Sequence, residues 1–145
     1  MESVAVLAVV DGSAGLITKC CKAIQGLHDL IMEYKHAELA IVSMIHELDV
    51  VQMAWEQLSM RLDNHNDNKP VDSEVLERIK RSLDCGMIVM SALERDLTYY
   101  RMSGKSFGPS QRMHAVWDSS TFQGHLDRIR GQALSMTLLL TVVKL

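Results

Sequence analysis

Four long stretches of this chain repeat their apolar residues every three or four positions, the spacing that places them on one face of an α-helix. The chain has only two prolines, Pro70 and Pro109, and both fall between these stretches. The stretches run approximately from Ser3 to Glu33, Ala37 to Leu62, Ser73 to Tyr100 and Ser120 to Val143. Such helices can bury their apolar faces only against one another. The sequence therefore predicts an all-α fold, an antiparallel bundle of four long helices that forms a single domain over residues 1–145.

The apolar faces of these helices supply the predicted core. The first stretch contributes Val4, Leu7, Ala8, Ala14, Ile17, Cys21, Ile24, Leu27 and Ile31, and the second Ile41, Met44, Ile45, Leu48, Val51, Trp55, Leu58 and Leu62. The third contributes Leu76, Ile79, Leu83, Met87, Met90, Leu93 and Leu97, and the fourth Phe122, Leu126, Ile129, Ala133, Met136, Leu140 and Val143. The last set follows a heptad pattern, which is typical of a helix seam.

The connections between the stretches are rich in turn-forming residues. The segment from Asp63 to Pro70 has no apolar residue, so we expect it to be mobile. Either Asp72 or Ser73 can cap the third helix. The segment from Gln111 to Trp117 is compatible with a short extra helix or a lead-in turn. Ser120 with Gln123 fits a capping box at the start of the last helix.

The net charge of −3 and the isoelectric point of about 6.0 argue against nucleic-acid binding, for which basic domains are typical. The apolar run from Val4 to Val10 follows an acidic start and precedes Asp11, which is atypical of a secretory signal. Three cysteines, two of them adjacent, do not form a disulfide framework. We therefore expect a cytoplasmic protein, which becomes associated with a membrane on activation if the first helix inserts.

Three motifs of enzymes and metal sites are incomplete in this chain. Gly104-Lys105-Ser106 lacks the earlier glycine and the preceding strand of a phosphate-binding loop. His46-Glu47 lacks the second histidine of a zinc-protease helix, since Val50 occupies its position, and His46 is expected on a helix surface or half buried. Adjacent Cys20 and Cys21 point about 100° apart on a helix and do not share a zinc ion easily. We expect no enzymatic activity, cofactor or metal.

The ten methionines divide into two groups. Four lie on apolar stripes and are expected to fill the core: Met44, Met87, Met90 and Met136. The others can form a plastic surface that adapts to a partner. The predicted interaction surface consists of Met53, Met60, Met102 and Met113. Met32 is a further candidate for this surface.

The first stretch is unusual because Asp11 is its one charged residue between Ser3 and Thr18. Two interpretations remain open. In the first it is a bundle helix that is buried on most sides. In the second it leaves the bundle to enter a membrane or an oligomer, where its small residues allow close helix packing. The glycines indicate either a kink or close backbone packing. The predicted membrane or oligomer segment consists of Val4, Leu7, Ala8, Gly12, Gly15 and Leu16.

Three segments of the chain carry the pattern of a known family. The first is the acidic start and small-residue apolar helix from Met1 to Ile17. The second runs from Ser73 through Cys85-Gly86 to Leu97, with a central pair of small residues and a Leu-Glu pair near its end. The third runs from the basic-aromatic lead-in Arg112–Trp117 to the leucines at positions 138–140. Together these three segments resemble the fungal HeLo-like N-terminal domain. The second stretch resembles this family only by its period, and Trp55 departs from the family pattern.

The resemblance implies an accessory domain of intracellular fungal receptors of the STAND or NLR type, which act in innate immunity, heterokaryon incompatibility and programmed cell death. It implies self-association, with membrane insertion of the first helix in some relatives. We accordingly expect an excised domain or a stand-alone relative. An alternative is a helical dimerisation or protein-interaction module without membrane activity, which binds another helical protein through its methionines and the seam of its last stretch.

Overall fold

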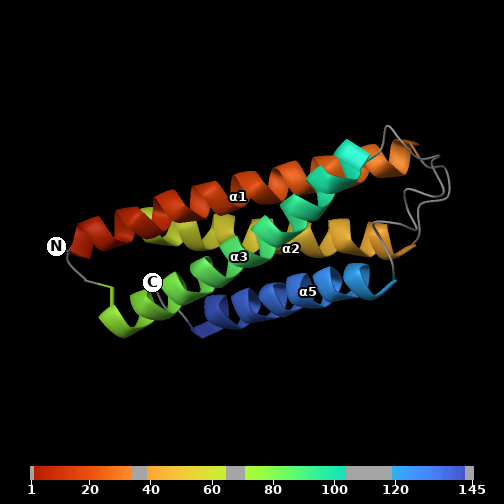
Figure 1. Cartoon of the computed structure of the whole chain (residues 1–145). Coiled ribbons are helices and arrows are strands. Elements are labelled where there is room, and N and C mark those ends of the chain that lie inside the picture. Colours follow the sequence, from red (N-terminus) through yellow and green to blue (C-terminus); the bar gives the residue numbers. More distant parts are fainter. Residues whose placement is uncertain (1, 34–38, 65–70, 104–118, 143–145) are drawn as a thin grey trace.

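The protein folds into a bundle of long helices, as Figure 1 shows for the computed structural model. The structure describes residues 2–33, 39–64, 71–103 and 119–142. These contain four helices and no strand, so the predicted all-α fold is confirmed: α1 (Glu2–Glu33), α2 (Leu39–Asp63), α3 (Ser73–Ser103) and α5 (Ser119–Val142). The predicted short helix from Gln111 to Trp117 lies outside the described residues. So does the segment from Asp63 to Pro70 that is predicted to be mobile, except for Asp63, which ends α2, and Asn64.

The four helices form a ring in the order α1, α2, α5, α3, so that α1 and α5 lie on opposite sides of the core, as do α2 and α3. Helices that follow one another in this chain run in opposite directions, as predicted (Figure 1). The two neighbouring pairs that do not follow one another in the chain, α1 with α3 and α2 with α5, are parallel. Lys19 of α1 contacts Glu94 farther along α3, beyond the contact of Gly12 with Leu83. Each helix therefore has one antiparallel and one parallel neighbour.

The predicted apolar faces of α2, α3 and α5 are confirmed. Of these faces, every described residue is buried except Ile45, Met87 and Leu140, which are partly buried and pack against the core. Trp55 is the largest fully buried side chain and lies on α2. Burial of each such side chain contributes about 1.5–3 kcal/mol relative to exposure, so these three stripes supply most of the driving force for the bundle.

The predicted apolar face of α1 is wrong in its first half. Val4, Leu7 and Ala8 are exposed, and Cys20 is buried in place of Cys21. The residues of α1 that the core buries are Val9, Ser13, Leu16, Cys20, Ala23, Gly26 and Leu27. The unbroken apolar run from Val4 to Val10 has no polar residue to mark which side faces solvent, so its periodicity does not fix the face. The interpretation of α1 as a helix of the bundle is confirmed, but α1 is not buried on most sides, because only 22% of its most apolar 18-residue window is buried.

The helix starts show one confirmed cap and one correction. Asp72 caps α3, since its carboxylate Oδ1 accepts a hydrogen bond from the backbone N–H of Glu74 at 3.0 Å. The predicted capping box of α5 is wrong. Gln123 directs its side-chain amide one turn forward and donates to Asp127 Oδ1 at 2.8 Å, and α5 already begins at Ser119.

Candidate functional site

The outward face of α1 exposes apolar side chains near the beginning of the helix. Val4 is 69% exposed and Leu7 is 56% exposed, and Ala8 and Gly15 are exposed beside them. Asp11 is the one charged residue on this part of the face. Farther along, the same face carries Lys22, Gln25 and Asp29 and is polar. The apolar surface is therefore confined to the first half of α1.

The length and composition of α1 are sufficient to cross a lipid bilayer. The segment from Val4 to Asp29 has 26 residues, and its most apolar window of 18 residues has a mean hydropathy of 1.6. At 1.5 Å per residue it spans about 39 Å, more than the roughly 30 Å of a hydrocarbon core. Core helices of soluble proteins also reach such values, but they are mostly buried, whereas only 22% of this window is buried.

The six residues of the predicted membrane or oligomer segment divide between two surfaces. Val4, Leu7, Ala8 and Gly15 are exposed on the outward face. Leu16 is fully buried, and Gly12 lies against Leu83 of α3. The two glycines therefore differ: α1 continues without interruption past both, Gly12 serves close packing, and Gly15 has open space around it. The structure does not bring the six residues together on one face.

A reciprocal contact between leucines and glycines joins α1 to α3. A Cβ atom on Gly12 would lie 2.5 Å from Cδ2 of Leu83, and a Cβ atom on Gly86 would lie 2.9 Å from Cδ2 of Leu16. Each helix thus inserts a leucine over a glycine of the other. We call these four residues the Leu–Gly interlock. Because both glycines lack a side chain, the two backbones approach closely and their relative register is fixed.

An ion pair continues the α1–α3 contact beyond the interlock. Lys19 Nζ lies 2.7 Å from Glu94 Oε2. The hydrogen bond from Lys19 and its positive charge lower the pKa of Glu94 below its usual range. The pair favours folding above the ordinary pKa of a glutamate, and this contribution is lost as the pH falls through the lowered value. Since Glu94 is well exposed, the contribution is small.

Two members of the predicted methionine surface are exposed in the structure. Met53 and Met60 are each more than half exposed on the outward face of α2. His46 and Glu56 share this face, which interrupts the apolar area. The other two predicted positions, Met102 and Met113, lie outside the residues whose side chains the structure describes.

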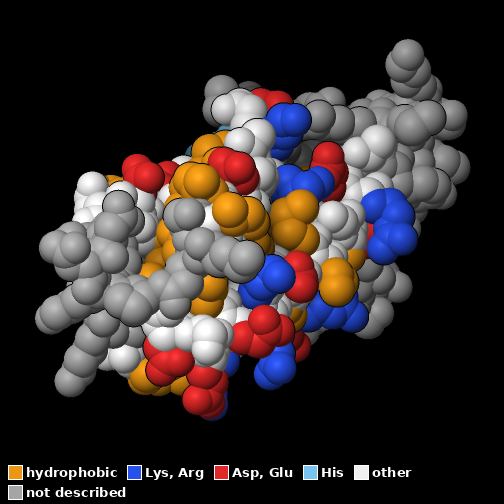
Figure 2. Space-filling model, turned by 90° about the vertical axis from the view of Figure 1, so that its left-hand side faces the viewer, with side chains coloured by type: hydrophobic (Ala, Val, Ile, Leu, Met, Phe, Trp, Pro, Cys, Tyr) orange, Lys and Arg blue, Asp and Glu red, His pale blue; other side chains and the backbone are white. Residues whose placement is uncertain are grey.

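A second exposed apolar strip lies on α5, and the sequence prediction missed it. Its members are Leu134, Leu138 and Val142, which are spaced by four residues and are 59–71% exposed. The run of leucines at positions 138–140 was an available signal, because three consecutive leucines on a helix cannot all face one core. The predicted docking seam of the last stretch, in contrast, is largely buried within this chain. Figure 2 looks onto the end of the bundle where α1 begins and α5 ends, and apolar side chains gather there among acidic and basic ones.

The chemical groups of the described residues do not converge on a reactive centre. No group of three metal-binding side chains is found among them. Burial raises the pKa of the Cys20 thiol to about 12, so this cysteine stays protonated and weakly nucleophilic, while Cys21 and Cys85 are exposed. His46, the start of the incomplete zinc-protease motif, is exposed on α2.

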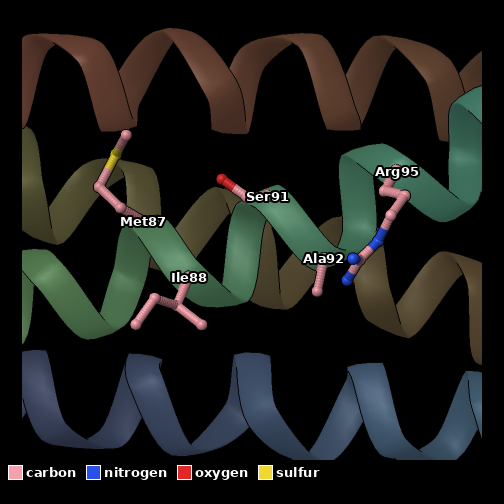
Figure 3. Close-up of a pocket in the computed structure, with 5 residues that line it drawn as sticks. All are labelled: Met87, Ile88, Ser91, Ala92 and Arg95. Carbon is pink, nitrogen blue, oxygen red and sulfur yellow. The ribbon is translucent and has the colours of Figure 1, made fainter.

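The depression in Figure 3 lies over the outer surface of α3. It is open, has a volume of about 540 Å³, and its lining residues all belong to that one helix. Met87 points toward α1, whereas Ile88 and Ala92 point toward α5 (Figure 3). Arg95 is the only charged residue of the lining. The depression does not bring polar groups from different helices together, as an active site requires.

Comparisons with known family models, with curated proteins and with solved structures each found no match for this chain.

Proposed function

We propose that this protein is a non-enzymatic signalling module of the HeLo-like kind, which acts by self-association and by insertion of α1 into a membrane. The proposal includes a cytoplasmic location before activation and a role in a fungal receptor pathway, as the resemblance implies. Its partners are further copies of the chain and membrane lipid.

The outward face of α1 is the observation that carries this proposal. Val4, Leu7 and Ala8 expose apolar surface in the folded bundle, within a segment long enough to span a bilayer. A soluble protein gains nothing from such a surface on its own, whereas a lipid phase or an apolar partner would cover it. The confinement of this surface to the beginning of α1 suits a helix that enters a membrane with its N-terminal end first.

Gly15 provides a sharp test of membrane insertion, because it lies near the middle of the Val4–Asp29 segment and has open space around it. The variant Gly15→Glu should fold normally, since glutamate favours a helix more than glycine does. A charged residue at the centre of a spanning helix costs about 2.5–3.5 kcal/mol of insertion. We expect dye release from vesicles of phosphatidylcholine and phosphatidylserine to fall by roughly 100-fold.

Gly131 supplies the matched control. It is exposed on α5, no atom would lie within 4 Å of an added Cβ, and Gly131→Glu makes the same chemical change with the same net charge. This variant should release dye as the original chain does. Equal release by both variants would rule out insertion of α1. Circular dichroism and urea unfolding of both variants show whether the bundle is intact.

The dimerisation alternative is favoured by a different observation, the exposed strip of Leu134, Leu138 and Val142 on α5. In this case the protein forms a stable dimer in solution and leaves vesicles intact. Light scattering distinguishes the two functions: a dimer that Leu138→Glu dissociates, together with no dye release from the original chain, would favour the alternative.

A further inference from the structure

The four helices are not held equally in this bundle. Among the described residues, α1 and α2 have the most extensive contacts, and α1 packs along both α2 and α3. The Leu–Gly interlock and the Lys19–Glu94 ion pair add specific contacts to α3. The contact between α3 and α5 is the least extensive of the four neighbouring pairs. The two most extensive contacts join α2 and α3 to α1, and we call these three helices the three-helix unit. α5 occupies the groove between α2 and α3 on the side opposite α1.

Two buried polar side chains contribute to the contact between α3 and α5. His125 and Gln132 are both buried, and both belong to α5. His125 Nε2 lies 2.5 Å from Asp96 Oδ2, and Gln132 Nε2 donates to the backbone oxygen of Ser82 at 3.2 Å. That oxygen is accessible because Gly86, one turn later, has no side chain to cover it. These hydrogen bonds define the register of α5 but add little apolar contact.

Polar contacts also join α5 to α2 at the rim of the groove. Arg130 Nε lies 3.6 Å from Glu47 Oε1, and Arg61 Nη1 donates to the backbone oxygen of Leu140 at 3.0 Å. Between the two rims, α5 fills the groove with Phe122, Leu126, Ile129, Ala133 and Met136. Without these side chains the apolar faces of α2 and α3 would be exposed. The groove therefore requires a helix with this pattern of apolar and polar contacts, and α5 of another copy has the same pattern.

We propose that two copies of this protein associate by exchanging α5, so that α5 of each chain fills the groove between α2 and α3 of the other. Fifteen residues separate the end of α3 at Ser103 from the start of α5 at Ser119. Fully extended, they reach about 50 Å, which is comparable to the length of α1 and allows α5 to reach a neighbouring copy. The exchange remakes every α5 contact and leaves the outward face of α1 uncovered. This inference rests on the self-association part of the proposed function and specifies its geometry.

Opposite charge changes on α2 and α5 test the exchange. In Glu47→Lys the new lysine faces Arg130 of its own chain, and in Arg130→Glu the new glutamate faces Glu47. When the two variants are mixed and refolded together from urea at high concentration, an exchanged heterodimer pairs the new lysine with the new glutamate and the original Glu47 with the original Arg130. Random pairing gives equal amounts of heterodimer and homodimers, and native mass spectrometry should show a ratio of heterodimer to homodimers roughly fivefold above that value.

The outcomes separate exchange from other ways of forming a dimer. A dimer that meets through an outer surface keeps both charge conflicts within each chain, so heterodimers at the statistical share would overturn the proposal, as would the absence of any dimer. The chain that carries both changes, Glu47→Lys with Arg130→Glu, restores the pairing within one molecule. As a control it should dimerise as the original chain does.

The buried pair provides a second test that does not depend on an exposed contact. Asp96→His places two histidines across the α3–α5 contact, and His125→Asp places two acids there. We expect each variant alone to lose helical structure, and a mixture to recover it, because each groove then receives the complementary α5. Lack of recovery, together with a statistical share in the first test, would overturn the exchange. Dye release is measured separately with Gly15→Glu, so a failure of membrane insertion is distinguishable from a failure of exchange.

Discussion

Individual glycines of this bundle have opposite roles, although all of those described lie within helices. Gly15 and Gly131 face open space, so they only weaken their helices. Gly12 and Gly86 receive the leucines of the Leu–Gly interlock, and Gly86 also contacts the side-chain amide of Gln132. At positions 15 and 131 glycine lowers the stability of its own helix, whereas at positions 12 and 86 it allows the backbones of α1 and α3 to approach.

Alanine substitutions should therefore change stability in opposite directions. Gly15→Ala and Gly131→Ala are each expected to raise the free energy of unfolding by about 0.5–1 kcal/mol, because alanine favours a helix and its methyl group meets nothing. Gly86→Ala is expected to lower it by about 1–2 kcal/mol. Its methyl group would displace the fully buried Leu16 and the amide of Gln132, and overpacking outweighs the gain in helix propensity.

Urea unfolding followed by circular dichroism measures these changes. Gly12→Ala should also be destabilising relative to Gly15→Ala, the same change only three positions away, since its methyl group would meet Leu83 Cδ2. Equal effects at positions 12 and 15 would show that the interlock contributes nothing to the packing of α1 on α3.

At the level of helices, the sequence predicts which face is buried only where polar residues mark the other face. The stripes of α2, α3 and α5 could be predicted for this reason. The face of α1 could not, because apolar residues surround its first turns, and the prediction chose Cys21 where the structure buries Cys20. Periodicity also does not name the partner of a face. The contact of Gly12 with Leu83 depends on the parallel arrangement of α1 and α3, which no local pattern encodes.

The unequal contacts of the helices predict an order of opening. Backbone amides in the middle of α5, around Ile129 and Ala133, should exchange with deuterium more readily than those of α1 around Leu16 and Cys20. The free energy of the opening that exposes the α5 amides should be lower by at least about 1 kcal/mol. The reason is that α5 can leave the groove while the three-helix unit stays paired. Hydrogen exchange with mass spectrometry at increasing urea concentrations measures both openings. If α1 opened first, the three-helix unit would not exist as a separate unit of stability.

For the whole molecule, the ring order separates the two proposed activities in space. α1 and α5 lie on opposite sides of the core, so the surface proposed for lipid and the helix proposed for exchange do not compete. A dimer formed by exchange would carry two outward faces of α1 at once. Two such faces bind one membrane more strongly than one does, because the second contact becomes intramolecular.

This separation predicts that dimer formation promotes membrane leakage. Glu47→Lys and Arg130→Glu, each alone, should release dye from vesicles severalfold more slowly than the original chain, since both weaken the seating of α5 in any copy. A refolded mixture of the two should recover most of the release.

Release by the original chain should rise with roughly the square of the protein concentration while monomers predominate, because two molecules form the active species. Adding Gly15→Glu to both chains of the mixture should abolish the recovery without dissociating the heterodimer. Release that is linear in concentration, with no recovery on mixing, would mean that a single bundle inserts α1 on its own.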